Sequence, residues 1–108
     1  MNKKVGILAG KLVNDLDLLQ RHITMLQSVA ENEPIGIIKL AERLKLPQHK
    51  VRYSLRLLEL DGLIEATSTG AITTKKLKPF LKELKSQLSS MNRLTANIQR
   101  SIEGIEKM

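Results

Sequence analysis

The stretch from Leu44 to Ile64, LKLPQHKVRYSLRLLELDGLI, constrains the fold more than any other part of the chain. Pro47 suits the first position of a helix, where its missing N–H costs nothing. Gly62 can adopt the left-handed conformation that ends a helix. We therefore expect a helix over residues 47–61, with an inner face spaced at i, i+4 and i+7. The residues of that face are Val51, Leu55 and Leu58.

A shorter helix is expected immediately before this one, joined to it by a turn at Lys45 and Leu46. Gly36 can serve as its N-cap. Its inward residues are Ile37, Leu40, Ala41 and Leu44. Ile35, just before the cap, could contribute one or two residues to a sheet.

A long N-terminal helix is expected from about residue 8 to residue 30. Its apolar residues recur at steps of three and four, which places them on one stripe. They are Leu8, Leu12, Leu16, Leu19, Ile23, Leu26 and Ala30. Pro34 ends this helix, because proline cannot continue the hydrogen-bond ladder and moves its predecessor out of helical geometry.

Two short strands are expected after Gly62, at residues 63–67 and 71–73. Residues 68–70, Ser-Thr-Gly, form a tight turn between them. The fold class that follows is mostly α, with a small two- or three-stranded β-wing on a helix-turn-helix core.

The last third of the chain carries an unbroken heptad pattern from residue 77 to residue 105. It predicts a long helix with Leu81, Leu88, Thr95 and Ile102 at a positions and Leu84, Met91, Ile98 and Ile105 at d positions. A helix of this length, roughly 40 Å, must bury its stripe, and a homodimeric coiled coil is the favoured interpretation. Pairing with residues 8–30 of the same chain is the alternative. Thr74 and Lys78 are both possible first residues.

Composition agrees with one helical, basic domain. Apolar residues make up 42% of the chain but aromatic residues only 2%, so the core must be built from Leu and Ile. We assign residues 1–32 to a helix that supports dimerisation, 33–75 to the winged core and 76–108 to the dimerisation helix. Lys and Arg number 18 against 11 Asp and Glu, and a net charge of +7 favours an anionic partner such as nucleic acid.

Basic residues gather on the second helix of the helix-turn-helix. Residues 45–56 contain four basic side chains and no acidic one, whereas residues 1–43 contain six and five. This clustering favours double-stranded DNA, with helix 47–61 in the major groove. The outward candidates are Gln48, His49, Lys50, Arg52, Tyr53 and Arg56. Gln48 and Arg52 can bond base edges, Lys50 and Arg56 suit phosphates, and Tyr53 suits either.

The order of these elements resembles the winged helix-turn-helix transcription regulators, including the arsenic-repressor and multiple-antibiotic-resistance types. Residues 34–44, PIGIIKLAERL, resemble the second helix of that family, and LELDGLI at 58–64 resembles the exit from its recognition helix. The resemblance covers roughly residues 25–78. It implies a homodimeric, sequence-specific DNA-binding regulator, with further phosphate contacts from Thr69 in the wing and from Lys76.

The sequence departs from that family in three places. Pro47 replaces the usual Ser or Thr before the recognition helix. The wing at 67–70, Thr-Ser-Thr-Gly, lacks the Arg or Lys that many relatives insert in the minor groove, so we expect it to contribute little. The Cys and His clusters of metal-sensing relatives are absent, which argues against a response to metals.

A second stripe, formed by Tyr53, Leu57 and Leu60, is not explained by the inner face of its helix. Contact with one of the long helices and overfilling of the core account for it equally well. If these residues bind another protein, the chain is an assembly module rather than a DNA-binding protein. RNA binding is less favoured, because single-strand readers stack bases on aromatic side chains and this chain has only Tyr53 and Phe80.

Several classes of protein are disfavoured. Without cysteine, disulfides and thiolate metal sites are excluded. His22 and His49 lack acidic partners at ligand spacing, so we expect both to be polar surface residues and no metal or cofactor to bind. No nucleophile motif, carboxylate pair or phosphate-binding loop indicates an enzyme. No apolar run reaches the ~20 residues of a membrane span, and Lys11 comes too early for a secretory signal at residues 1–10; we expect a cytoplasmic protein.

Overall fold

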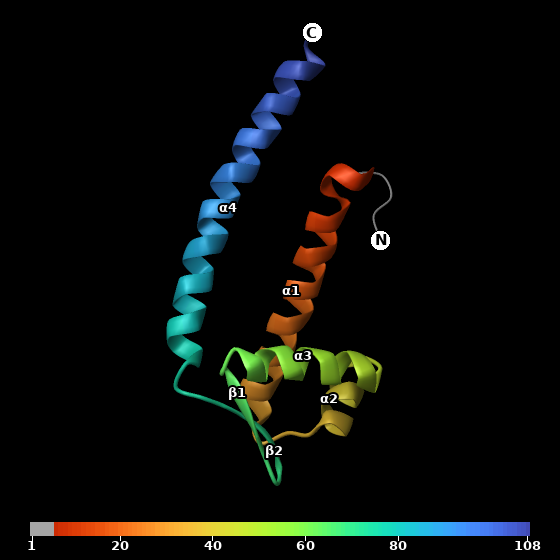
Figure 1. The fold of residues 1–108 in the computed structure, drawn as a ribbon, viewed down its shortest axis with the longest axis vertical. Helices are drawn as coiled ribbons and strands as arrows, with labels where there is room; N and C mark the ends of the chain where they lie inside the picture. The colour runs from red at the N-terminus through yellow and green to blue at the C-terminus, as the bar shows by residue number, and fades with distance from the viewer. Residues whose placement is uncertain (1–5) are drawn as a thin grey trace. The chain divides into compact units, whose positions relative to one another are not determined.

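The computed structural model describes residues 6–108 and divides into two compact units, the first ending at Lys75 and the second beginning at Lys76. The elements are α1 (Gly6–Asn32), α2 (Ile37–Leu44), α3 (Gln48–Leu60), β1 (Ile64–Thr67), β2 (Gly70–Thr73) and α4 (Leu77–Glu106) (Figure 1). This order confirms the predicted fold class, a winged helix-turn-helix core with long N- and C-terminal helices. Residues 1–5, which belong to the predicted segment 1–32 and to the start considered as a secretory signal, lie outside the described range.

The C-terminal part of α1 forms one wall of the core, and α3 crosses it there (Figure 1). Met25 and Val29 are completely buried. Neither belongs to the predicted stripe, of which Leu26 alone is buried. Leu8, Leu12, Leu16 and Ala30 of that stripe are exposed, so this part of the prediction was wrong. Asn32 closes the helix by donating from its side-chain amide to the Ser28 carbonyl at 2.8 Å.

The turn between α2 and α3 has the predicted location. Gly36 is the N-cap of α2, and Lys45 ends it in the left-handed conformation at φ 54°. The Leu46 amide then closes onto the Ala41 carbonyl at 3.1 Å. Pro47 is the N-cap of α3 and not its first helical residue, since its ψ of 147° is extended. The prediction for Pro47 was wrong by one position.

The end of α3 leads directly into the wing. Gly62 has a φ of 76°, the left-handed conformation expected of it. The Leu63 amide donates to the Leu58 carbonyl at 3.0 Å, which satisfies a carbonyl that the helix leaves free. Leu63 is buried and begins the path into β1.

The wing is a two-stranded antiparallel sheet in which Ile64 pairs with Thr73 and Ala66 with Ala71. Ile35 adds the expected short third strand as an isolated bridge to Ala71. Gly70 has a φ of 134°, and a Cβ there would lie 2.5 Å from the backbone carbon of Ile35. The close approach of these two backbones therefore requires glycine at position 70.

The core lies between α1, α2, α3 and the inner face of the wing. It is aliphatic, as the scarcity of aromatic residues predicts, but Met and Val join the expected Leu and Ile. Its most deeply buried apolar members are Met25, Leu40, Leu63, Val29 and Val51. One polar residue, Ser54, is buried as completely as these.

The second unit, Lys76–Met108, consists of α4 and the few residues that flank it. The helix begins at Leu77, between the two starts that the sequence left open, and its first bond joins the Phe80 amide to the Lys76 carbonyl at 3.2 Å. Pro79 falls in the first turn, where an N–H has no helical partner to lose. At ~1.5 Å per residue the helix is about 45 Å long. None of residues 77–106 is buried.

Candidate nucleic-acid interface

The outer face of α3 presents a row of polar and basic side chains. Gln48, Arg52 and Arg56 are exposed and follow one another at i, i+4 and i+8, so they share one face of the helix. His49 and Lys50 are exposed in the first turn beside this row. The opposite side of α3 is buried by Val51, Ser54 and Leu58. Burial of that side leaves the basic side outward.

The positive charges of this row are not neutralised within the first unit. Neither Arg52 nor Arg56 takes part in a salt bridge within residues 6–108, where Lys11 pairs with Asp15 at 2.8 Å. The guanidinium groups of Arg52 and Arg56 therefore remain available to an anionic partner. An exposed arginine with this freedom can bond a guanine edge with two hydrogen bonds or bind a phosphate.

Tyr53 lies on a different side of α3 from that row. Its ring centroid is 5.9 Å from that of His22, and the Arg21 guanidinium carbon is 5.9 Å from the ring centre. Both partners belong to α1. The side chain is 47% exposed. The structure thus brings Tyr53 to α1, one of the two possibilities that its stripe allowed.

The other members of that stripe differ in burial. Leu57 is half-buried, whereas Leu60 is 74% exposed at the end of α3. Overfilling of the core therefore does not explain Leu60. An exposed leucine on the same stripe as the half-exposed Tyr53 is compatible with a contact to another molecule.

The wing has no charged side chain at its tip. The Thr67 hydroxyl donates to the Gly70 carbonyl at 2.6 Å and also accepts from the Thr69 amide at 3.3 Å. These bonds hold the turn, and Thr69 itself is exposed. Lys76, the remaining candidate, is the N-cap of α4 and so belongs to the second unit.

His22 was expected to be a polar surface residue, and this prediction was wrong. Its Nδ1 lies 2.8 Å from the Ser54 hydroxyl oxygen. The Arg21 Nε donates to the same oxygen at 3.3 Å. The Nε2 atom is buried and has no hydrogen-bond partner among residues 6–108. Burial, and secondly the charge of Arg21, lowers the pKa of the His22 imidazole below its usual value. A serine within the apolar spacing of α3 was the only sign of this cluster in the sequence.

The apolar stripe of α4 is on the surface of its unit. The a and d positions of the heptad form the seam of the helix, and the seven apolar residues at these positions are all at least partly accessible to solvent. The eighth seam residue is Thr95, whose hydroxyl donates to the Asn92 carbonyl at 2.9 Å. The seven are Leu81, Leu84, Leu88, Met91, Ile98, Ile102 and Ile105. Exposure reaches 67% at Ile105. A continuous stripe of this size normally marks an interaction surface.

The described part of the chain contains neither a candidate metal site nor a candidate membrane-spanning helix. No group of three or more His, Cys, Asp or Glu is arranged to hold a metal ion among residues 6–108. Across the same range, no helix is both long enough and apolar enough to cross a membrane.

Comparison with known proteins gives a likeness of fold. The activation domain of the phage T4 transcription factor MotA has a TM-score of 0.52 with this chain at 20% sequence identity. The match covers 67% of this chain and 77% of that one. No protein-family model and no curated protein matches the sequence. At this identity the likeness supports the fold and not a shared activity.

Proposed function

We propose that the chain is a homodimeric, sequence-specific regulator that binds double-stranded DNA with α3 in the major groove. The observation that carries the proposal is the outward row of Gln48, Arg52 and Arg56, whose charges are free of ion pairs and whose scaffold is a winged helix-turn-helix. The MotA domain belongs to a transcription factor, which agrees with this proposal. Action on DNA also agrees with a cytoplasmic location.

Each residue of the row would have a distinct task. Gln48 and Arg52 would read base edges, while His49, Lys50 and Arg56 would bond phosphates and hold the register of the helix. Thr69 would add a neutral phosphate contact from the wing, and Lys76 a charged one. Tyr53, held beside α1, would orient α3 more than it contacts DNA.

Dimerisation would come from α4. A helix about 45 Å long whose apolar stripe is exposed gains stability by pairing that stripe with a second copy. The exposed Leu8, Leu12 and Leu16 of α1 offer additional apolar surface for the same assembly. Two copies related by a two-fold axis would place their α3 helices in successive major grooves, roughly 34–36 Å apart.

Binding to DNA is tested by anisotropy titration of the full chain, first with a random duplex and then with sites selected from a random pool. Arg52→Ala should reduce the preference for the selected site by about 1–3 kcal/mol. Arg93→Ala is the matched control, because Arg93 is an exposed arginine at an f position of the heptad, away from the seam. Equal affinity and preference for both variants and the wild type would refute the assignment of the reading face.

Pairing is tested separately by sedimentation equilibrium. Leu88→Asp introduces a charge at an a position and should convert the dimer to a monomer, whereas Ser89→Asp, at the adjacent b position, should not. A wild-type chain that is monomeric at micromolar concentration would contradict the dimer. The anisotropy titration with DNA would then report binding by a monomer.

The exposed Leu60 supports a second candidate, a protein-interaction module that uses Tyr53, Leu57 and Leu60. The two candidates predict opposite behaviour on heparin and on immobilised genomic DNA. A DNA-binding protein should be retained at moderate salt, and an interaction module should elute early. Early elution of the wild type from both resins would favour the second candidate.

A further inference from the structure

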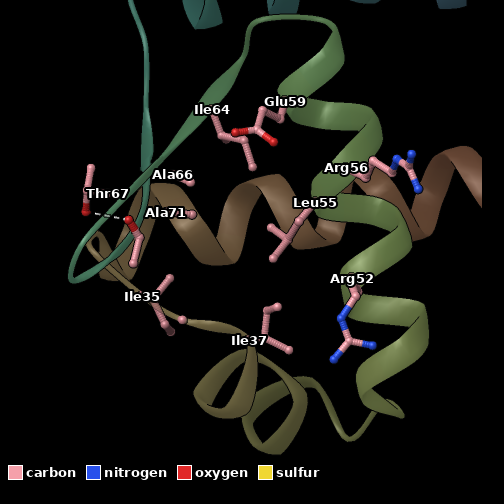
Figure 2. A pocket seen from close by; sticks show the side chains of 12 residues that line it. Ile35, Ile37, Arg52, Leu55, Arg56, Glu59, Ile64, Ala66, Thr67 and Ala71 are labelled. Carbon is pink, nitrogen blue, oxygen red and sulfur yellow. Dashed lines mark hydrogen bonds between the residues drawn. The ribbon is translucent and has the colours of Figure 1, made fainter.

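A trough runs between α3 and the wing, formed by two adjoining hollows of about 490 and 520 Å³. Ile35, Gly36, Ile37 and Arg52 line both, so the two hollows lie side by side. Figure 2 shows Leu55 pointing from α3 toward Ile35 and Ile37 across the first hollow. We call this feature the α3–wing trough.

The trough exists because the inner face of the wing carries small side chains. Ala66 and Ala71 are paired across the two strands and both line the first hollow, as does Gly70. Larger side chains at this pair would reach α3 and fill the space in front of Leu55. Ala66 is exposed although it points to the same side of the sheet as the buried Ile64.

The chemistry of the trough is an apolar floor with a cationic edge. Ile35 and Ile64 are buried in the floor, and Ile38 continues it at the far end, where it is 62% exposed. Arg52 is the one charged side chain shared by the two hollows, with Arg56 and Glu59 beside the first and Lys39 beside the second.

DNA does not account for this floor. Phosphates and sugars require donors and positive charge, and an apolar strip gains nothing by facing them. The trough follows α3 from Gln48 to Glu59, a distance of roughly 16 Å. That span corresponds to about three turns of a helix or five extended residues, which suits a polypeptide segment better than a compact small molecule.

We propose that the α3–wing trough binds an acidic amphipathic segment of a partner protein. Apolar side chains of the segment would lie on Ile35, Ile37 and Leu55, and a carboxylate near the middle would pair with Arg52. Helices with one apolar face are commonly recognised in grooves of this kind. The acidic character follows from charge complementarity with Arg52, Arg56 and Lys39.

Occupation of the trough would also regulate DNA binding, and this consequence rests on the proposed function. Arg52 cannot bond a base edge and a carboxylate of the partner segment at the same time. The partner and the duplex would therefore compete for the first unit.

The test uses the full chain and a fluorescein-labelled peptide of about four helical turns, with leucine along one face and glutamate beside it. Anisotropy should show saturable binding by the wild type. Ala66→Leu, which fills the first hollow, should weaken binding at least about tenfold. Ala30→Leu, an equal enlargement at an exposed position of α1, is the matched control and should bind like the wild type. Equal binding by both variants would overturn the proposal.

Two further measurements test the proposal without relying on a variant of the chain. The same peptide with lysine in place of glutamate should bind at least about tenfold more weakly, and equal affinity would refute the role of Arg52. Methyl NMR of the wild type, which does not depend on a folded variant, should show the largest shifts at Ile35, Ile37 and Leu55. Shifts confined to the α4 stripe would assign the peptide to the pairing surface and overturn the proposal.

Neither measurement contains DNA. A chain that binds the peptide but no duplex would refute the proposed function and leave the trough intact. Competition is then examined by adding unlabelled peptide to a preformed complex with DNA, where release of the duplex is the expected result and an undisturbed complex would refute the regulation.

Discussion

The imidazole Nδ1 of His22 and the hydroxyl oxygen of Ser54 lie 2.8 Å apart and join α1 to α3. The Arg21 Nε donates to the same hydroxyl oxygen at 3.3 Å, and Ser54 is completely buried. Because α3 carries the proposed reading row on its opposite side, this bond is one of the contacts that orient the row relative to α1.

Removal of the hydroxyl should destabilise the fold. Ser54→Ala leaves the His22 Nδ1 and the Arg21 Nε without their common partner, and such a loss in a partly buried site costs about 1–3 kcal/mol. Urea unfolding followed by circular dichroism measures this difference. Ser86→Ala on the exposed surface of α4 serves as the control and should be close to neutral. Equal stability of the two variants would show that the bond contributes nothing.

Stability should fall with acidification through His22. Burial lowers the pKa of the folded imidazole below its usual 6.5, so in the window just below that value the unfolded chain binds more protons than the folded chain. The free energy of unfolding therefore decreases as pH falls from about 6.5 toward the folded pKa, and the contribution is constant at higher pH. Unfolding curves between about pH 7.5 and pH 5.5 measure the slope.

His22→Gln should flatten this slope, since glutamine does not titrate. His49→Gln is the matched control, because His49 is exposed on α3, and it should keep the slope of the wild type. A slope that survives His22→Gln would assign the acid sensitivity to other groups.

Much of the fold was accessible from the sequence because local signals agreed with one another. Apolar spacing located α2 and α3, Gly62 marked the end of α3, and the heptad located α4. The errors at helix starts were small and have local causes: Pro47 takes an extended ψ, and α4 begins at Leu77, one residue before the later of the two starts left open.

The features that escaped prediction depend on tertiary structure. His22 and Ser54 are 32 positions apart, and a serine within the apolar spacing of α3 does not indicate which residue it meets. The α3–wing trough depends on the register that pairs Ala66 with Ala71, and alanine in a strand carries no signal of a hollow. The row of basic residues on α3 was predictable because it needs only the helix period.

Gly70 should tolerate no other residue. Its φ is positive, and a Cβ at this position would lie only 2.5 Å from the Ile35 backbone, so Gly70→Ala must displace either the wing or the bridge. We expect a loss of more than about 1 kcal/mol from the backbone conformation alone. Gly104→Ala, in α4 with open space around it, should instead be neutral or stabilising by up to about 1 kcal/mol. Thermal unfolding of both variants gives the comparison, and a stable Gly70→Ala would show that the wing is easily displaced.

The pairing proposed for α4 makes a prediction at its one polar seam position. Thr95 occupies an a position, where a β-branched apolar residue favours a two-stranded coiled coil and a polar one weakens it. Thr95→Ile should therefore strengthen the dimer by roughly 1–2 kcal/mol, which is about a tenfold lower dissociation constant. Sedimentation equilibrium across a dilution series measures it. Ser89→Ile is the matched control. Like Thr95, Ser89 donates from its hydroxyl to a carbonyl of its own helix, that of Lys85 at 3.1 Å, but it lies at a b position outside the seam. If Thr95→Ile and Ser89→Ile changed the dissociation constant equally, nonspecific apolar association would explain the result, and the heptad register would not describe the interface.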